Sequence, residues 1–228
     1  MNTEKGKGLS KGVGLSFIAL LGLALLSPNL ALATATGVCT NESGQSGLGD
    51  CTKSVTLTGD QLVIVLTNTS PLLNGGFITA DAFDLAGDAS ITAFSSSDAN
   101  FTLLPSPLPS TGGSFSVAPF GTREFLVSIA GDWLGGGNPT SGLGVGESAT
   151  FTFTLADFGS VTETNVLTSE ALRFRGFGDE GSDKTKASCD TGCEPPLNVP
   201  EPASLLLLGS GLTGLGLWGW KRRREVQV

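Results

Sequence analysis

Apolar and polar residues alternate along several short stretches between residues 54 and 177, a period of two that is typical of β-strands with one buried face. The clearest example is 147–155, in which alanine, phenylalanine and leucine alternate with threonine. The stretch 61–67 is apolar on both faces and predicts a central strand. Further strands are expected at 54–58, 76–85, 90–95, 101–104, 114–117, 124–129 and 171–177. No stretch in this region shows a helical period.

Turn-forming residues separate these stretches at intervals that are typical of all-β domains. The sequence therefore predicts an all-β fold, an antiparallel β-sandwich, and leaves open an immunoglobulin-like or a jelly-roll strand order. We place this domain at residues 36–178. Its first part, 36–53, is rich in Gly, Ser and Asn and predicts a loop, and residues 179–198 predict a polar linker.

The first 35 residues have the three parts of a secretory signal peptide. A segment with three lysines precedes an apolar run at 13–26, and Ala31 and Ala33 then supply the small residues that signal peptidase requires. Cleavage two residues later is the alternative, so the exported chain is expected to begin at residue 34 or 36. An uncleaved anchor is a further alternative, although 14 apolar residues are few for a membrane span.

The last segment, 199–228, contains three parts in a fixed order. Its first residues are Val199, Pro200, Glu201 and Pro202. The run 203–220 is uncharged, and as a helix it would span about 27 Å of a hydrocarbon core about 30 Å thick. It is followed by the basic residues Lys221, Arg222, Arg223 and Arg224. We therefore expect a single transmembrane helix at 203–220 with its basic end in the cytoplasm.

These three parts closely resemble the PEP-CTERM sorting signal of Gram-negative bacteria. The resemblance implies export through the Sec translocon and signal peptidase, then processing near Val199–Pro202 by an exosortase-type transpeptidase. The protein would sit in the inner membrane before processing and at the cell surface or outside the cell afterwards. Proteins with such tails often occur where exopolysaccharide and biofilm matrix are made. An ordinary single-pass anchor is the alternative.

Removing both ends changes the charge balance of the chain. The whole protein has a net charge of −8, whereas residues 34–198 hold six basic and 18 acidic residues, a net charge of −12. A surface with this much negative charge repels the phosphates of nucleic acid, and we therefore expect no nucleic-acid partner. The chain also contains no histidine, which excludes Ser-His and Cys-His catalysis and imidazole-ligated zinc.

Four cysteines in an exported chain predict two disulfides. They are Cys39, Cys51, Cys189 and Cys193. We favour pairing within each half of this set, because each pair is close in sequence and lies among turn-forming residues. Crossed pairing would instead tie the two ends of the domain together. A zinc site with four cysteine ligands is the remaining alternative, and the spacing fits it poorly.

Two groups of acidic residues are candidates for a calcium site. The first contains Asp81, Asp84, Asp88 and Asp98, and the second contains Asp179, Glu180 and Asp183. Calcium takes about six to eight oxygen ligands, and neither group has the spacing of a standard calcium loop. Surface acids without a metal are the competing interpretation. We therefore expect no cofactor, with calcium as the alternative.

Three aromatic residues are candidates for a sugar-binding cleft: Phe77, Trp133 and Phe177. Packing in the core is the competing interpretation for the two phenylalanines. Trp133 lies beside a Gly-rich segment and is the best candidate for an exposed aromatic residue.

Two polar motifs are interpreted as having no special role. Thr150, Thr152 and Thr154 form one row, and rows of this kind bind ice only when neighbouring strands repeat them. The sequons that begin at Asn41, Asn68 and Asn100 are interpreted as coincidental.

Two classes of function follow. The first is a non-enzymatic surface or matrix protein that is sorted through its tail and associates with extracellular polysaccharide. The alternative is a carbohydrate-binding module or a carbohydrate-active enzyme with a pair of catalytic carboxylates, either of which could depend on calcium.

Overall fold

The computed structural model describes residues 34–41, 46–134, 137–178 and 181–193. Its strands are β1 (Thr34–Asn41), β2 (Cys51–Thr58), β3 (Gln61–Asn68), β4 (Gly75–Phe83), β5 (Ser90–Ser96), β6 (Thr102–Leu104), β7 (Phe115–Ser116), β8 (Thr122–Arg123), β9 (Phe125–Ser128), β10 (Ser148–Ala156), β11 (Ala171–Phe177) and β12 (Ser182–Thr191). Its helices are the 3-10 turn η1 (Pro139–Ser141) and α1 (Glu163–Ser169). Each stretch predicted to be a strand overlaps one of these strands.

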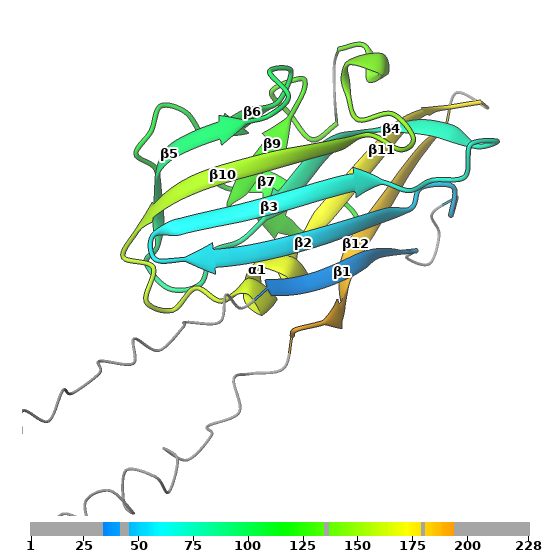
Figure 1. Cartoon of the computed structure of the whole chain (residues 1–228). Coiled ribbons are helices and arrows are strands. Elements are labelled where there is room, and N and C mark those ends of the chain that lie inside the picture. Colours follow the sequence, from blue (N-terminus) through cyan, green and yellow to red (C-terminus); the bar gives the residue numbers. More distant parts are fainter. Residues whose placement is uncertain (1–33, 42–45, 135–136, 179–180, 194–228) are drawn as a thin grey trace, which may run out of the picture. The chain divides into compact units, whose positions relative to one another are not determined.

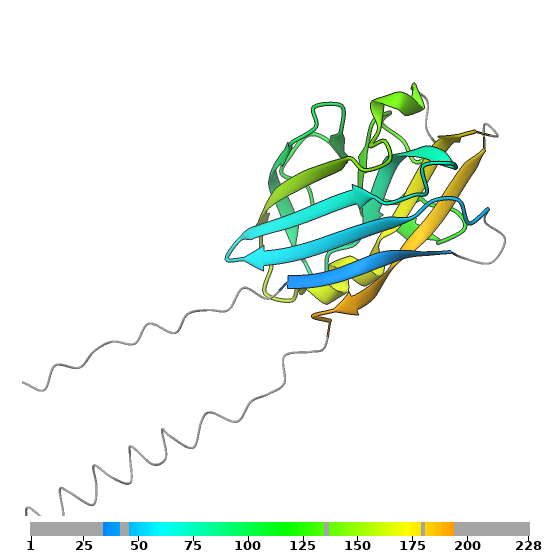
Figure 2. The same ribbon diagram turned by 45° about the vertical axis from the view of Figure 1, so that its right-hand side comes forward.

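Ten of the strands form one antiparallel sheet in the order β5-β10-β3-β2-β1-β12-β11-β4-β9-β6. The sheet curls, so that β3 and β10 pass in front of β4 and β11 (Figures 1 and 2). The structure therefore confirms an antiparallel all-β fold. Where a sandwich of two sheets was expected, the core lies between the two halves of one nearly closed sheet, and β7 and β8 form a separate two-stranded sheet.

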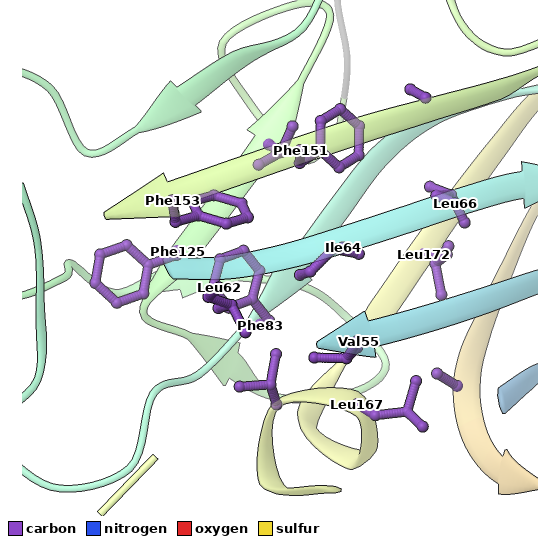
Figure 3. Packing of buried hydrophobic residues seen from close by; sticks show 14 of the residues in the cluster. Val55, Leu62, Ile64, Leu66, Phe83, Phe125, Phe151, Phe153, Leu167 and Leu172 are labelled. Atoms are coloured by element: carbon purple, nitrogen blue, oxygen red, sulfur yellow. The ribbon is translucent and has the colours of Figure 1, made fainter. Parts of the chain in front are cut away.

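Phenylalanines from opposite halves of the sheet meet in the core (Figure 3). The rings of Phe83 on β4 and Phe153 on β10 have their centroids 5.2 Å apart, and Phe125 on β9 stacks on Phe83. Leu62 and Ile64 of β3 are fully buried beside them. Burying side chains of this size stabilises a fold by roughly 1.5–3 kcal/mol each, so these contacts hold the sheet in its curled form.

Strands β1 and β12 correct two predictions. The segment 36–53, predicted to be a loop, contains most of β1, and the segment 179–198, predicted to be a polar linker, contains β12. The inward side of β12 consists of Asp183, Thr185 and Ala187, and its neighbour β1 contributes Gly37 to the same region. The pattern of apolar alternation that marks a half-buried strand is therefore absent, although both strands lie in the middle of the sheet.

Helix α1 is a second correction, since no helix was expected between residues 54 and 177. Thr162 caps its N-terminus by accepting a hydrogen bond from the backbone N–H of Asn165. Val166 and Leu167 are its buried residues, and they pack into the core beside β1, β2 and β12. Two apolar residues in seven are too few to show a helical period, which explains why the sequence did not indicate this helix.

Both disulfides join residues that are close in sequence. Cys39 on β1 is bonded to Cys51 on β2, with Cα atoms 5.0 Å apart, and Cys189 on β12 is bonded to Cys193, with Cα atoms 6.1 Å apart. This is the pairing favoured from the sequence, and it leaves no free cysteine for a zinc site.

The predicted signal peptide, sorting motif, transmembrane helix and basic block lie outside the described residues. Within the part of the chain that the structure describes, no helix is both long and apolar enough to cross a membrane.

Candidate functional site

Four of the six basic residues between positions 34 and 198 lie on one face of the sheet. Arg173 on β11 is directly opposite Lys184 on β12. Arg175 and Lys186 stand two residues from them along the same strands, and side chains two residues apart share a face. The residues between them, such as Leu172 and Phe174, are buried in the core. We call the outer surface that carries these four cations the basic face.

Arg173 is the most buried cation of the basic face, with only 9% of its surface exposed. Its Nη1 donates a hydrogen bond to the carbonyl oxygen of Trp133. Burial, followed by the nearby charge of Arg175, lowers the pKa of Arg173 from its usual value, while Asp132 acts in the opposite direction.

An open groove of about 570 Å³ lies along this face. It is lined by Phe77, Asn138, Pro139, Thr140, Arg173, Arg175, Gly176, Phe177, Gly181 and Ser182. Guanidinium groups, an aromatic side chain and short hydroxyl and amide side chains are the groups that bind acidic sugars, because they match carboxylates, sugar faces and sugar hydroxyls. Asp179 and Glu180, which follow these residues in sequence, lie outside the described residues.

Residues 138–140 form one wall of the groove, and the loop that they begin continues to Gly146. Asn138 caps η1 by accepting a hydrogen bond from the N–H of Thr140. Leu143 then exchanges two backbone hydrogen bonds with Ile78 of β4, at 2.9 and 3.0 Å. Asn68, which is fully buried, donates from Nδ2 to the carbonyl oxygens of Gly76 and Leu143. The wall is thus tied to the sheet by backbone and side-chain bonds.

A small hairpin of β7 and β8 covers the neighbouring part of the same outer surface. Its turn residues Val117 and Phe120 pack on an outer apolar cluster with Leu126 of β9. The ammonium group of Lys186 lies 5.2 Å from the centre of the Phe120 ring, a cation–π contact. The basic face therefore continues from the groove to the edge of this hairpin.

Trp133 belongs to that same outer cluster and is 3% exposed. The expectation that it is an exposed sugar-stacking residue is wrong, because the β7–β8 region covers its indole. Phe177 is likewise buried, as core packing predicted, whereas Phe77 is half-buried and contributes to the groove lining.

The first acidic group does not converge in the structure. Asp81 is fully buried, which contradicts the interpretation as a surface acid. Asp84 accepts a hydrogen bond from the N–H of Glu124 and pairs with Arg123 at 3.6 Å. Asp88 is exposed, and Asp98 accepts a bond from its own loop.

In the second acidic group, only Asp183 lies within the described residues. It is buried on β12, and its Oδ2 accepts hydrogen bonds from the N–H groups of Leu48 and Gly49. Its role here is to fix the loop before Cys51. The described ranges contain no group of three or more metal-binding side chains.

The outer surface of β10, β3 and β2 carries no charged side chain at the paired positions. Thr150, Thr152 and Thr154 face outward as predicted, but their partners on β3 are Val65, Val63 and Gln61. The row is therefore not repeated at the paired positions of β3. The outward threonine of β3 is Thr67, which pairs with Ser148, and further threonines face outward on β2, for example Thr52. Among the sequon asparagines, Asn68 is buried and Asn100 is exposed.

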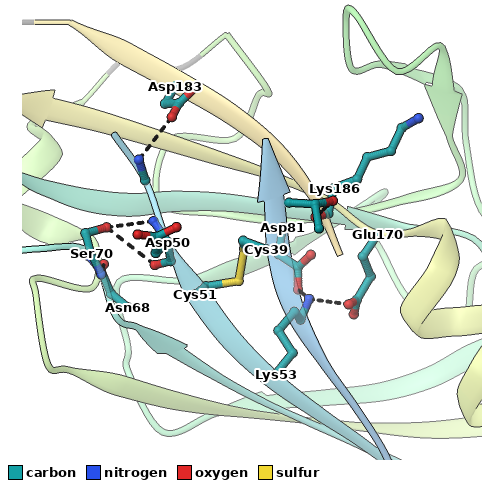
Figure 4. The surroundings of a disulfide bond; sticks show 12 residues. Cys39, Asp50, Cys51, Lys53, Asn68, Ser70, Asp81, Glu170, Asp183 and Lys186 are labelled. Carbon is teal, nitrogen blue, oxygen red and sulfur yellow. Dashed lines mark hydrogen bonds and ion pairs between the residues drawn. A yellow bond between two sulfur atoms is a disulfide. The ribbon is translucent and has the colours of Figure 1, made fainter. Parts of the chain in front are cut away.

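A second charged cluster lies inside the sheet (Figure 4). The Nζ atom of Lys53 is 2.6 Å from Oδ2 of Asp81 and 2.6 Å from Oε2 of Glu170, and all three side chains are fully buried. The sequence alone did not indicate this cluster, because each residue comes from a different element. It did not indicate the basic face either, although the spacing of Arg173 and Arg175, and of the two lysines, places each pair on one side of a strand.

Comparison with known proteins characterises only the C-terminal end. No curated protein and no solved structure matches the chain. A family model for the PEP-CTERM protein-sorting motif matches residues 198–224, which covers the Val199–Pro202 motif, the apolar run and the basic block. The motif is a recognition signal for exosortase-type processing. The chain therefore carries a PEP-CTERM sorting motif and is an exported, sorted protein.

Proposed function

We propose that the β-domain is a non-enzymatic surface or matrix protein that binds acidic extracellular polysaccharide through its basic face. The single observation that carries this proposal is the gathering of Arg173, Arg175, Lys184 and Lys186 on one outer surface of a domain whose net charge is −12. If the basic residues were distributed at random over this acidic domain, acidic side chains would separate the four cations. Concentrating them creates, within the described residues, a basic surface that an anionic polymer can approach.

The chemistry of the groove favours a carboxylated or sulfated sugar chain over a neutral one. Arginine binds carboxylate with two parallel hydrogen bonds. Arg175 lines the open groove, where its Nη1 also donates a hydrogen bond to the carbonyl oxygen of Gly137. The acidic remainder of the domain repels a polyanion, so binding is confined to this face and weakens as salt screens the charges. A polymer with repeating anionic units offsets this weakening of binding, because it engages many copies of the domain at once.

Localisation follows from the sorting motif in this proposal. Signal peptidase removes residues 1–33 after passage through the Sec translocon, and the C-terminal helix holds the chain in the inner membrane. An exosortase-type transpeptidase then acts near Val199–Pro202 and transfers the domain toward the cell surface. The domain needs no cofactor for binding, and neither histidine nor an exposed pair of carboxylates takes part.

The test is calorimetric titration of the purified mature protein with an acidic and a neutral polysaccharide of similar length. We expect heat of binding only with the acidic polymer, and a loss of at least about tenfold in affinity for Arg175→Gln combined with Lys184→Gln. Thr52→Glu is the control, because it adds negative charge to the uncharged surface. Equal binding of both polymers, or an equal loss in the control, would contradict the proposal. Repeating the titration with a chelator tests calcium dependence.

A further inference from the structure

Three ionisable side chains that take no part in the basic face are buried together in the interior. Lys53 comes from β2, Asp81 from β4 and Glu170 from the residue that ends α1. Their side chains are 0% exposed. Burying an ion pair usually costs about as much as its attraction returns, so apolar residues would have served stability at least as well. Such a cluster in a core therefore points to a chemical role.

The polar atoms of this cluster are incompletely satisfied within the described residues. Oδ1 of Asp81 and Oε1 of Glu170 are buried without a hydrogen-bond partner there. Buried oxygen atoms in native proteins nearly always have a partner, and each exception calls for an explanation. A bond that removes the charges of Lys53 and Asp81 would remove much of this cost.

The geometry places a nucleophile against a carboxyl group. The 2.6 Å separation between Nζ of Lys53 and Oδ2 of Asp81 is a contact distance. Leu172, which is opposite Asp81, and Val55, two residues from Lys53 on β2, are fully buried. Holding two reacting groups at such a distance replaces a collision in solution by an internal step, with effective concentrations that exceed about 10⁵ M in well-oriented cases. Burial of these side chains also favours the neutral amine and carboxylic acid over the ion pair, and it opposes hydrolysis of the product.

Glu170 is placed to move the proton. Burial, opposed by the charge of Lys53 and assisted by that of Asp81, raises the pKa of Glu170 to about 8. Burial also raises the pKa of Asp81 from its ordinary value. At neutral pH Glu170 therefore carries a proton that it can donate to a neighbouring oxygen, and it contacts the reacting nitrogen at 2.6 Å.

We propose that Lys53 and Asp81 condense into an intramolecular amide bond, with Glu170 as the catalytic residue. The Lys53 ammonium first gives a proton to the Asp81 carboxylate. The neutral amine attacks Cγ of Asp81, forming the N–C bond while the carbonyl electron pair moves to oxygen, which Glu170 stabilises by hydrogen bonding. Glu170 then relays a proton from the nitrogen to the hydroxyl group, the C–O bond breaks, and one water molecule leaves. No oxidant, reductant or further reactant is needed.

The bond would connect the two halves of the sheet through its interior. β2 and β4 are separated by β1, β12 and β11 in the sheet order, and Lys53 and Asp81 are 28 residues apart in sequence. A cross-link between them restricts the unfolded chain as a disulfide does. Unlike the Cys39–Cys51 disulfide on the neighbouring strands, an amide bond does not open under reducing conditions.

Intact-mass spectrometry of the mature protein, obtained by expressing the full chain, tests the proposal after reduction of both disulfides. We expect a mass lower than that of the sequence by one water molecule, in all or in a growing fraction of the protein. Chymotrypsin cleaves after the leucines between the two residues and should release the Lys53 peptide joined to the Asp81 peptide. Folded protein that keeps the full mass would overturn the proposal, and a bond from Lys53 to Glu170 would overturn Asp81 as the acceptor.

Glu170→Gln separates the role of Glu170 from the fold. Glutamine has the same shape but cannot relay the proton, so the folded variant should keep its full mass. Lys53→Met removes the nucleophile and should also keep its full mass. Because the wild-type mass is measured first, a variant that fails to fold does not affect the main test. A Glu170→Gln protein that loses water at the wild-type rate would contradict the catalytic assignment.

Discussion

Arg173 and Lys184 stand directly opposite each other on neighbouring strands, a pairing of like charges in a domain that has acids in excess. Like charges at opposed positions destabilise a sheet. We therefore expect Lys184→Gln to raise the free energy of unfolding by about 0.2–1 kcal/mol while weakening polysaccharide binding. Urea denaturation measures the first effect and titration measures the second.

The control for Lys184→Gln is Lys186→Gln. Lys186 is opposite Ala171 and lies over the ring of Phe120, so removing its charge ends a favourable contact. This variant should lose about 0.5–1 kcal/mol of stability. If both variants shifted stability in the same direction, repulsion between Arg173 and Lys184 would not be the cause.

The buried amide of Asn68 ties the groove wall to the sheet, so Asn68→Ala should loosen it. The substitution leaves the carbonyl oxygens of Gly76 and Leu143 without this donor, and each unmade buried hydrogen bond costs about 1–3 kcal/mol. We expect a loss of at least about 2 kcal/mol and faster amide hydrogen exchange at Ile78 and Leu143. Asn100→Ala, at an exposed position of the same sequence motif, should change stability by less than about 0.5 kcal/mol.

The sequence predicted those strands in which every second residue is apolar and faces the core. β3 and β10 each show it, because Leu62, Ile64, Phe151 and Phe153 face the core at every second position. β12 could not be predicted in this way, because Asp183 and Thr185 fill its buried side. The N–H groups of Leu48 and Gly49 donate to the buried carboxylate of Asp183, and this contact joins residues about 135 positions apart.

The sequence predicts on which side of a strand the arginines of the candidate site lie, but it does not predict which strands bring the site residues together. Arg173 and Arg175 face one side of any strand that contains them, and the sequence indicates that strand. Their position beside Lys184 depends on the pairing of β11 with β12, which the polar sequence of β12 did not suggest. The burial of Lys53 was even harder to predict from the sequence, because it depends on the curled sheet bringing both Asp81 and Glu170 to Lys53.

Glu170 should make the stability of the domain depend on pH. Its pKa is about 8 in the folded protein and near 4.5 in the unfolded chain, so between these values the folded state binds more protons. Stability therefore falls as pH rises from about 5 to 8, by up to about 1.4 kcal/mol per pH unit. The sign is the same with the amide bond formed, because burial is the main cause of the shift.

Denaturation of Lys53→Met and of Lys53→Met combined with Glu170→Gln across this range measures the effect, because neither protein can form the amide bond. Glutamine does not titrate and Asp81 is present in both proteins, so the difference between them isolates the contribution of Glu170. We expect the double variant to lose the part of the decline above about pH 5 that Glu170 causes in the single variant. Identical pH profiles would mean that Glu170 is ionised in the folded state.

The beginning of β1 distinguishes the two signal peptidase sites. Ala35 is fully buried and pairs with Val55, and the hydroxyl groups of Thr34 and Thr56 are 3.0 Å apart. Cleavage after Ala33 keeps these contacts, whereas cleavage after Ala35 removes the first two residues of β1. We therefore expect the mass of the mature protein to correspond to a chain that begins at Thr34. A chain shortened to begin at residue 36 should be less stable by about 1 kcal/mol or more, since it loses a buried side chain and backbone hydrogen bonds to β2. Unchanged stability of the shortened chain would show that these two residues contribute nothing to the sheet, and the fold would then give no preference between the sites.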